Sequence, residues 1–261
     1  LIKHRHHLEE LVEERTAALE RSNEELEQFA YVASHDLQEP LRKVQAFGDR
    51  FVARYGTLVD ERGRDYLDRM QGAGRRMGTM IQDLLSLSRV TTKGSAFVPV
   101  DLTAEVQHVL SDLEVAIDEC GGVLEIGDLP VIEADPSQIR QLLQNLLSNA
   151  FKYHKPGISP LVKIHAVMSP SEGPEGGGVC RLYVEDNGIG FEQTYVDRIF
   201  EPFQRLHGRA EYEGTGIGLA VCRKIVVRHG GSITAESEPG HGSTFIVTLP
   251  ANQQKETSKH G

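Results

Sequence analysis

The sequence is poor in cysteine and in positive charge, and each shortage excludes a class of protein. The three cysteines, Cys120, Cys180 and Cys222, are widely spaced and form no CxxC pair. This pattern fits a reducing compartment better than a disulfide framework or a zinc site, so we expect a cytoplasmic location. The formal net charge is −10, and such an acidic balance argues against nucleic acid as the partner.

Long apolar runs are also missing. No stretch approaches the length of a membrane span, and no signal-peptide pattern opens the chain, so we expect no membrane segment. The 261 residues suffice for one or two domains with at least one full core. Because a helical pattern begins almost at Leu1, we expect the chain to be part of a longer protein.

The first residues show two features, each open to two interpretations. His4, His6 and His7 could bind a metal, but no other ligands lie nearby, which favours a solvated cluster at a helix end. Apolar residues then recur at every seventh position: Val12, Leu19, Leu26 and Ala33. This heptad pattern predicts a marginal coiled coil over residues 1–28, and the alternative is an amphipathic helix packed on its own domain.

A helical hairpin is predicted over residues 29–92. The helical pattern breaks around residues 56–63 and then resumes, with one apolar face formed by Tyr66, Met70, Ala73, Met77, Ile81, Leu84 and Ser88. Two helices joined by a short loop form an antiparallel hairpin, which cannot bury both apolar faces alone. We therefore expect a homodimer that closes a four-helix bundle with two-fold symmetry.

The segment TTKGSAFVP (91–99) is interpreted as a linker. Before it the sequence pattern is helical, and after it helical and strand-like stretches are mixed. Helical stretches begin near Asp101, Asp135 and Gly218, and strand-like stretches lie between and after them, as in VLEIG, LVKIHAVM, VCRLYVED, SITAES and STFIVTLP. The sequence therefore predicts an α+β domain over residues 97–250, with helices on one face of a mixed sheet. The polar tail, residues 251–261, is expected to be disordered.

Polar residues interrupt one of these amphipathic helices. Asn145 and Asn149 are four residues apart, so they share one helical face, and Lys152 follows. An amide oxygen is a hard ligand suited to Mg²⁺, and a lysine supplies a point charge for phosphate. The alternative is a merely amphipathic helix.

Two glycine-rich segments could hold a nucleotide. In EDNGIGF, Gly188 and Gly190 would let the backbone approach a ligand, and the Asp186 carboxylate could select the exocyclic amine of adenine; the alternative is a strand-ending turn. The second segment, GTGIGLA, opens a helix with Gly214, Gly216 and Gly218. The free amides and the positive dipole end of that helix suit phosphate.

In combination, these motifs resemble the catalytic portion of sensor histidine kinases over nearly all of residues 29–250. The resemblance rests on six segments in chain order: SHDLQEPLR as the H box, QNLLSNAFKY as the N box, EDNGIGF as the first G box, IFEPFQR as the F box, GTGIGLA as the second G box and GHGSTF as the third. It implies the Bergerat-type ATP-binding fold for the α+β domain. The amino-acid sequence of the later motifs is most similar to that of kinases linked to phytochrome or PAS-type sensors.

The resemblance implies a reaction in which neutral His35 attacks the γ-phosphoryl group of ATP. Asp36 would fix the tautomer of His35 and act as the acid–base partner. Arg205 would stabilise charge on the transferring phosphate. The phosphoryl group would then pass to an aspartate on a response-regulator receiver domain, and a sensor domain would precede Leu1.

The resemblance also assigns ligand contacts. Asn149 is the expected Mg²⁺ ligand, with Asn145 near the phosphates, and Lys152 and Tyr153 would contact phosphate and ribose. Adenine is expected at Asp186, and the remaining nucleotide-site residues are Gly188, Gly190, Gly214, Gly216, Gly218 and Thr244. Residues 191–218 would form a lid, with Phe200 and Phe203 as its apolar anchors.

Two residues beside His35 add specific expectations. Pro40 cannot donate a backbone hydrogen bond to the Asp36 carbonyl, which costs roughly 3 kcal/mol in a helix, so we expect a bend there. Glu39 occupies the place where bifunctional kinases of this family carry Thr or Asn, which predicts weak phosphatase activity. Two alternatives remain: a degenerate ATP-binding signalling module without kinase activity, and a gyrase-like or chaperone-like ATPase, which the H box disfavours.

Overall fold

The structure is a computed structural model that describes residues 14, 15, 32, 34, 36–92, 94–170, 178–206, 212 and 214–252. It divides into two compact units, Leu1–Ser88 and Arg89–Gly261, and the boundary lies inside a helix. Three sequence expectations lie outside the described residues: the coiled coil over residues 1–28 apart from residues 14 and 15, the nucleophile His35, and the tail from residue 253 onward.

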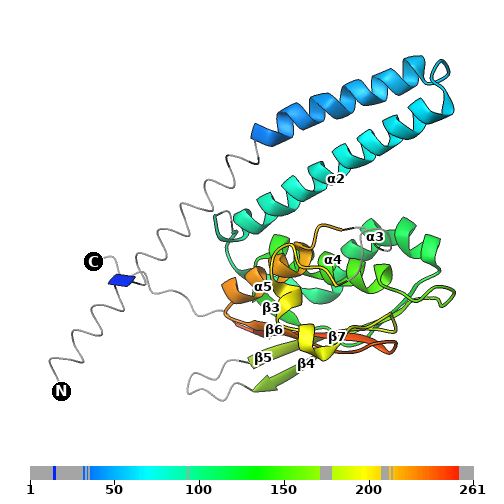
Figure 1. Ribbon diagram of the computed structural model, residues 1–261. Helices are drawn as coiled ribbons and strands as arrows, with labels where there is room; N and C mark the ends of the chain where they lie inside the picture. The colour runs from blue at the N-terminus through cyan, green and yellow to red at the C-terminus, as the bar shows by residue number, and fades with distance from the viewer. Residues whose placement is uncertain are drawn as a thin grey trace. The chain divides into compact units, whose positions relative to one another are not determined.

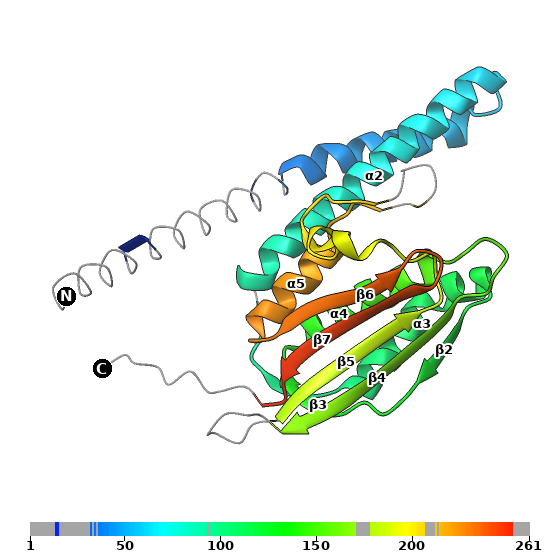
Figure 2. The ribbon, with the colours of Figure 1, turned by 60° about the horizontal axis from the view of Figure 1, so that its bottom comes forward.

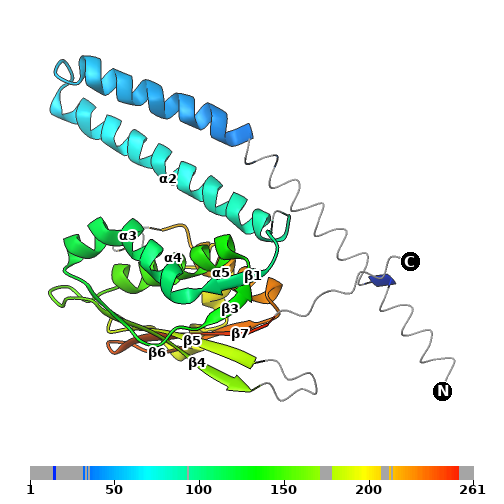
Figure 3. The ribbon, with the colours of Figure 1, turned by 180° about the vertical axis from the view of Figure 1, so that it is seen from behind.

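The first unit is the predicted helical hairpin. One helix covers residues 36–55, a loop follows, and α2 spans Glu61–Thr92 (Figure 1). The start of α2 is capped because Asp60 Oδ1 accepts a hydrogen bond of 2.8 Å from the amide of Gly63. The two helices lie side by side in the views of Figures 1 and 3, as the short loop requires.

Contacts across the hairpin come from residues near Pro40 and from the glycines of α2. Leu41 is the buried apolar residue of the first helix, at 9 % exposed. Its side chain, with that of Gln45, packs against Gly74 and Gly78. The helix passes through Pro40 without interruption, from residue 36 onward. Pro40 therefore removes one amide donor from the ladder without ending the helix.

The hairpin leaves a large apolar surface exposed on a single chain. Its large exposed apolar residues are Leu37, Val44, Phe47, Phe51, Tyr55, Leu58, Tyr66, Met70, Met77 and Met80. Three of them, Tyr66, Met70 and Met77, belong to the predicted apolar face of α2. An exposed apolar surface of this extent is typical of an interaction site, and the two helices that the structure describes in this unit leave it uncovered.

The second unit contains a five-stranded mixed sheet in the order β2-β4-β5-β7-β6. Its strands are β2 (Val123–Ile126), β4 (Leu161–Pro170), β5 (Gly178–Asp186), β6 (Ser232–Glu238) and β7 (Gly242–Pro250). The pair β2–β4 is parallel and the other pairs are antiparallel. The helices α3 (Leu102–Cys120), α4 (Pro136–Lys152) and α5 (Gly218–Arg228) lie on one face of this sheet (Figure 2). The predicted α+β class and the mixed sheet are thus confirmed.

Helix starts follow the capping chemistry of the sequence. The Asp101 side chain accepts the amides of Thr103 and Ala104 at the start of α3, and Asp135 caps α4 in the same way, with Pro136 as the first helical residue. The helices bury aliphatic side chains against the sheet. Fully buried examples are Leu142, Leu143, Leu146 and Leu147 of α4 and Val162 and Ile164 of β4.

The linker was predicted too long at its C-terminal end. Val98 and Pro99 belong to β1 (Val98–Asp101), which pairs antiparallel with β3 (Val131–Ala134) in a separate two-stranded sheet (Figure 3). Each strand has four residues and lies at a proline, Pro99 within β1 and Pro130 just before β3, which in the sequence favours a loop over a strand. Within the described residues, no helix is both long enough and apolar enough to cross a membrane.

Candidate functional site

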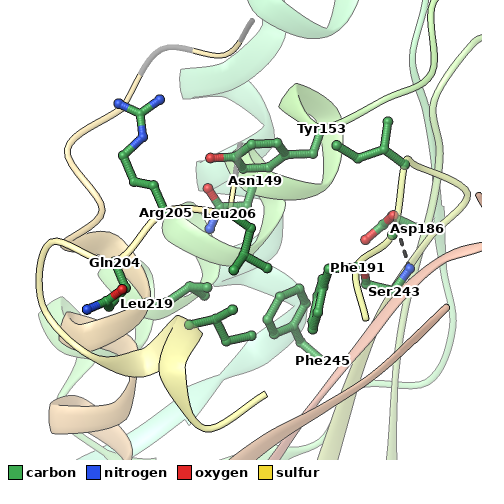
Figure 4. A pocket seen from close by; sticks show the side chains of 13 residues that line it. Asn149, Tyr153, Asp186, Phe191, Gln204, Arg205, Leu206, Leu219, Ser243 and Phe245 are labelled. Carbon is green, nitrogen blue, oxygen red and sulfur yellow. Dashed lines mark hydrogen bonds between the residues drawn. The ribbon is translucent and has the colours of Figure 1, made fainter. Parts of the chain in front are cut away.

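A pocket in the second unit gathers residues from most of the predicted motifs. It lies between the C-terminal part of α4, the end of β5, the start of α5 and β7 (Figure 4). Its lining residues are Asn149, Tyr153, Asp186, Ile189, Gly190, Phe191, Ile199, Gln204, Arg205, Leu206, Leu219, Ser243 and Phe245. The fold therefore assembles one site from segments separated by almost a hundred residues.

Asp186 supplies the carboxylate of the pocket at the end of β5. Its Oδ1 accepts hydrogen bonds from the amide of Gly188 at 2.8 Å and from the amide of Ser243 at 3.2 Å. Because both of these bonds reach Oδ1, Oδ2 can accept from a ligand. Burial raises the pKa of this carboxyl group to about 6, although the two amides and the charge of Lys155 partly offset the rise.

The pocket walls beside Asp186 are apolar. The rings of Phe191 and Phe245 lie 6.5 Å apart between centroids, and Leu206 and Leu219 line the same space (Figure 4). Apolar walls around one oriented acceptor favour a flat aromatic ligand that carries an amino donor. The adenine interpretation of the sequence fits this arrangement.

Glycines bring the backbone close to the pocket where a side chain would not fit. A Cβ atom at Gly188 would lie 2.3 Å from the Tyr153 carbonyl oxygen, so the loop after β5 packs directly on the end of α4. Gly190 has a φ of 62°, in the left-handed region that favours glycine, and a Cβ there would lie 2.0 Å from the Glu238 carbonyl oxygen. Both glycines therefore shape the loop that carries Asp186.

The polar face of α4 meets the second glycine segment. Asn145 Nδ2 donates to the carbonyl of Gly218 at 3.3 Å, and Asn149 lines the pocket. A Cβ atom at Gly214 would lie 2.7 Å from Lys152 Nζ, so this amine lies beside the segment. Lys152 Nζ also donates to the hydroxyl of Tyr153 at 3.3 Å.

Backbone donors are available where α5 begins. Gly218 is its first residue, and the preceding Ile217 makes no side-chain cap hydrogen bond. Gly216, in the left-handed region with a φ of 77°, directs the chain into this helix. An amine, two amides and an uncapped helix start thus converge beside the pocket, which is the chemistry that polyphosphate requires.

Arg205 lies at the rim of the pocket and contacts the lid backbone. Its two guanidinium nitrogens donate to the carbonyls of Gly214 and Tyr212, each at 2.6 Å. The Tyr212 hydroxyl in turn donates to the carbonyl of His154 at 3.1 Å, and its ring lies 5.0 Å from that of Tyr153. Arg205 therefore holds described parts of the predicted lid in this structure.

Two expected positions differ from the structure. Thr244 does not line the pocket: it pairs with Glu185 and Glu236 across the sheet, on the face opposite to its neighbours Ser243 and Phe245. Side chains alternate along a strand, and the buried Phe245, Val247 and Leu249 fix which alternate set faces inward. Because Ser243 lies two residues before Phe245, this alternation identifies Ser243, and not Thr244, as the residue that faces the pocket.

The second difference concerns the lid anchors. Phe200 is buried and packs edge-on against Phe245, with ring centroids 6.4 Å apart. Phe203 is 54 % exposed and has a φ of 64°, an unusual backbone conformation for a residue with a large side chain. Only Phe200 is therefore an apolar anchor in this structure.

The described residues hold no cluster of three or more His, Cys, Asp or Glu side chains that could bind a metal. The oxygen donor that α4 offers to a Mg²⁺ ion in the pocket is the side-chain amide of Asn149, and a hard cation accepts such an oxygen together with phosphate and water ligands. Asp36 belongs to the first unit, and the neighbouring His35 lies outside the described residues.

Two protein families match the chain. Residues 25–93 match the His Kinase A (phospho-acceptor) domain. Residues 134–253 match the family described as histidine kinase-, DNA gyrase B-, and HSP90-like ATPase. The first match contains the H box and the hairpin, and the second contains the pocket.

Two relatives are similar to this chain over most of its length. Phytochrome-like protein Cph1 of Synechocystis is 40 % identical over 232 residues, covering 89 % of this chain and 30 % of the relative. Cyanobacterial phytochrome A of Nostoc is 39 % identical over 243 residues, covering 93 % of this chain and 31 % of the relative. The chain thus spans about a third of the length of these relatives.

Solved structures show the same fold. Full-length ShkA in complex with AMPPNP has a TM-score of 0.65 and 24 % identity, covering 87 % of this chain and 46 % of that one. The Acinetobacter baumannii histidine kinase AdeS has a TM-score of 0.55 and 23 % identity, covering 83 % of this chain and 98 % of that one.

Proposed function

This chain belongs to the sensor histidine kinases, with phytochrome-type kinases among its relatives, and from that membership we propose that it transfers the γ-phosphoryl group of ATP to His35. The observation that carries the proposal is the pocket, in which the half-buried Asp186 carboxylate and apolar walls suit a base, and the polar end of α4 offers groups for a sugar and a polyphosphate. The phosphoryl group would then pass to an aspartate of a response-regulator receiver domain.

Asp186 would bind the base. Its Oδ2 would accept the exocyclic amine of adenine while Oδ1 stays bonded to the amides of Gly188 and Ser243. Phe191 and Phe245 would flank the ring, since they form the apolar walls beside this carboxylate. Tyr153 would contact the ribose from the end of α4.

The polyphosphate would lie between α4 and the start of α5. Lys152 and the backbone amides around Gly214, Gly216 and Gly218 supply positive charge and donors there. Asn149 would bind Mg²⁺, with Asn145 close by, and the ion would neutralise charge on the phosphates. Arg205 would release the lid carbonyls of Tyr212 and Gly214 and turn its guanidinium to the transferring phosphate.

The acceptor chemistry is assigned to the H box. Neutral His35 has a ring lone pair that can attack phosphorus, and Asp36 would accept a hydrogen bond from the other ring nitrogen. Such a transfer depends mainly on positioning and on electrostatic stabilisation.

We also propose that two chains pair through the hairpin. The exposed apolar residues of both helices, such as Phe47, Phe51 and Met70, would then be buried in a four-helix bundle. The outer surface of this bundle, around the H box, would receive the response regulator. The signal would arrive through the helix that precedes residue 36.

Autophosphorylation tests the proposal. The full chain is incubated with γ-labelled ATP and Mg²⁺, next to a His35→Gln variant and a His108→Gln control, because His108 is an exposed histidine of α3. We expect label in the wild type and in the control but none in His35→Gln. Nucleotide binding without any label in the wild type would instead indicate a degenerate ATP-binding module.

A further inference from the structure

A polar cluster outside the nucleotide pocket joins the linker to the ATP-binding domain. It consists of Asp135 before α4, Gln138 in its first turn and Arg228 at the end of α5, and we refer to these three residues as the linker clamp. None of them lines the pocket. Their partners are Val90, in the last turn of α2, and Ser95, in the linker. All five residues belong to the second unit.

Asp135 accepts more hydrogen bonds than helix capping requires. Its Oδ1 accepts the amides of Ser137 and Gln138, which is the capping interaction. Its Oδ2 accepts the amide of Ser95 at 2.6 Å and Arg228 at 3.1 Å. The side chain is fully buried, and although burial raises its pKa, the bonds from Ser137, Ser95, Gln138 and Arg228 lower the pKa overall.

Arg228 binds the linker through its backbone and through a ring. One guanidinium nitrogen donates to the Ser95 carbonyl at 3.0 Å, and the group lies 5.0 Å from the ring centroid of Phe97. A Cβ atom at Gly94 would overlap the guanidinium group, so a larger residue there would require the Arg228 side chain to shift. The other nitrogen donates to Gln138 Oε1 at 2.8 Å.

Gln138 extends the clamp to the end of α2. Its Nε2 donates to the carbonyl of Val90 at 2.9 Å, and Val90 is 2 % exposed. Because α2 ends at Thr92, the Val90 carbonyl has no amide four residues further along the same helix. The ATP-binding domain therefore supplies the missing donor, and both ends of the connecting segment are bonded to it.

We propose that Arg228 is a positioning residue: with Asp135 and Gln138 it fixes Val90, Ser95 and Phe97 on the ATP-binding domain, so that this domain moves together with the last turn of α2. The chain would then flex upstream of Val90, within α2. A movement of the end of α2 would move the nucleotide site by the same amount, because the two are held together. The consequence for phosphoryl transfer rests on the proposed kinase function, whereas the clamp itself does not.

Arg228→Leu tests this role, since it removes the three hydrogen bonds of the guanidinium and keeps an apolar stem. Two control variants of the full chain accompany it. Ser95→Ala is expected to leave all measured quantities unchanged, because both hydrogen bonds of Ser95 use its backbone. Arg223→Gln removes an exposed arginine from the same helix. Gln138→Leu, which frees the Val90 carbonyl, replaces Arg228→Leu should the latter not fold.

Three quantities are measured in each variant: amide hydrogen exchange of residues 89–97, the Kd of a fluorescent ATP analogue, and the rate of label incorporation. In Arg228→Leu we expect exchange to accelerate about tenfold, because one of the three lost hydrogen bonds, that to the Ser95 carbonyl, holds the linker directly. We also expect several-fold slower phosphoryl transfer with an unchanged Kd. Both controls should match the wild type.

Three results would overturn the proposal. The first is unchanged exchange over residues 89–97 in Arg228→Leu, and the second is exchange in the wild type as fast as in an unfolded chain. The third is slower transfer that is accompanied by a matching loss of nucleotide affinity, which would indicate a purely structural role. If the wild type takes up no label, the kinase proposal fails, and the exchange data still decide whether the clamp exists.

Discussion

The amide of Ser243 donates a hydrogen bond of 3.2 Å to Oδ1 of Asp186, so the first residues of β7 orient the carboxylate at the end of β5 (Figure 4). With the bond from Gly188, this contact fixes Oδ1 inside the protein and leaves Oδ2 for the ligand. The neighbouring strands β5 and β7 thus determine the direction in which the carboxylate accepts.

Asp186→Asn is expected to weaken ATP binding. The amide oxygen of Asn can replace Oδ1, but its NH₂ group would then face the amine of adenine, donor against donor. Loss of a hydrogen bond to a charged group costs about 1.5–3 kcal/mol, which corresponds to an increase in Kd of roughly ten- to a hundredfold. Isothermal titration with an ATP analogue measures this, with Thr244→Ala as the control, because Thr244 lies on the other face of the strand. Equal affinities of Asp186→Asn and the wild type would contradict the assignment.

ATP affinity should depend on pH through the same carboxyl group. Burial raises the pKa of Asp186 to about 6. Above that pH the carboxylate accepts the amine of adenine with its full charge, and below it the proton removes this charge. We therefore expect Kd to rise as the pH falls from 7.5 to 5, with a midpoint near 6. Asp186→Asn should lose this midpoint, so a midpoint that persists in the variant would assign it to another group.

Asn149→Ala should remove the magnesium dependence of binding while Mg²⁺-free binding is retained. The side chain lines the pocket at the end where the phosphates are proposed to lie. Its loss deprives the ion of its protein ligand but leaves the adenine contacts intact. Titrations with and without a chelator should therefore differ in the wild type and coincide in Asn149→Ala. If the variant still binds ATP more tightly with Mg²⁺, a residue other than Asn149 is the metal ligand.

Much of this architecture follows from local chemistry in the sequence. Asp101 and Asp135 predict the starts of α3 and α4, and periodicity predicts the helical hairpin and the long strands, all of which are confirmed. The short strands β1 and β3 were not predicted because a proline lies within or just before each four-residue stretch, and because their pairing joins residues 30 to 36 positions apart.

The site was predicted less completely. Asp186 and Asn149 lie in recognisable motifs and reach the pocket, whereas Thr244 was misplaced because motif position was used in place of strand alternation. The contacts of Arg228 could not be predicted, since they join residues 90 or more positions apart in the chain through tertiary packing alone.

Glu39→Thr is expected to increase phosphatase activity toward a phosphorylated receiver domain. The Glu39 side chain is exposed and pairs with Lys43 at 2.6 Å. A carboxylate only accepts hydrogen bonds and repels an incoming phospho-aspartate, whereas a hydroxyl could orient the attacking water. Loss of labelled phosphate from the receiver measures the rate. Glu61→Thr, which removes an exposed charge at the start of α2, serves as the control. Fast dephosphorylation by the unmodified chain would contradict the prediction.

The central claim is that His35 receives the phosphoryl group of ATP, and the most direct test is to locate the phosphate on the chain. The full chain is incubated with ATP and Mg²⁺, digested at neutral pH and fragmented under conditions that preserve phosphohistidine. We predict a single modified residue, His35, whose label is lost in acid and absent when Mg²⁺ is chelated. Phosphate on any other residue, or none on a chain that binds ATP, would contradict the account.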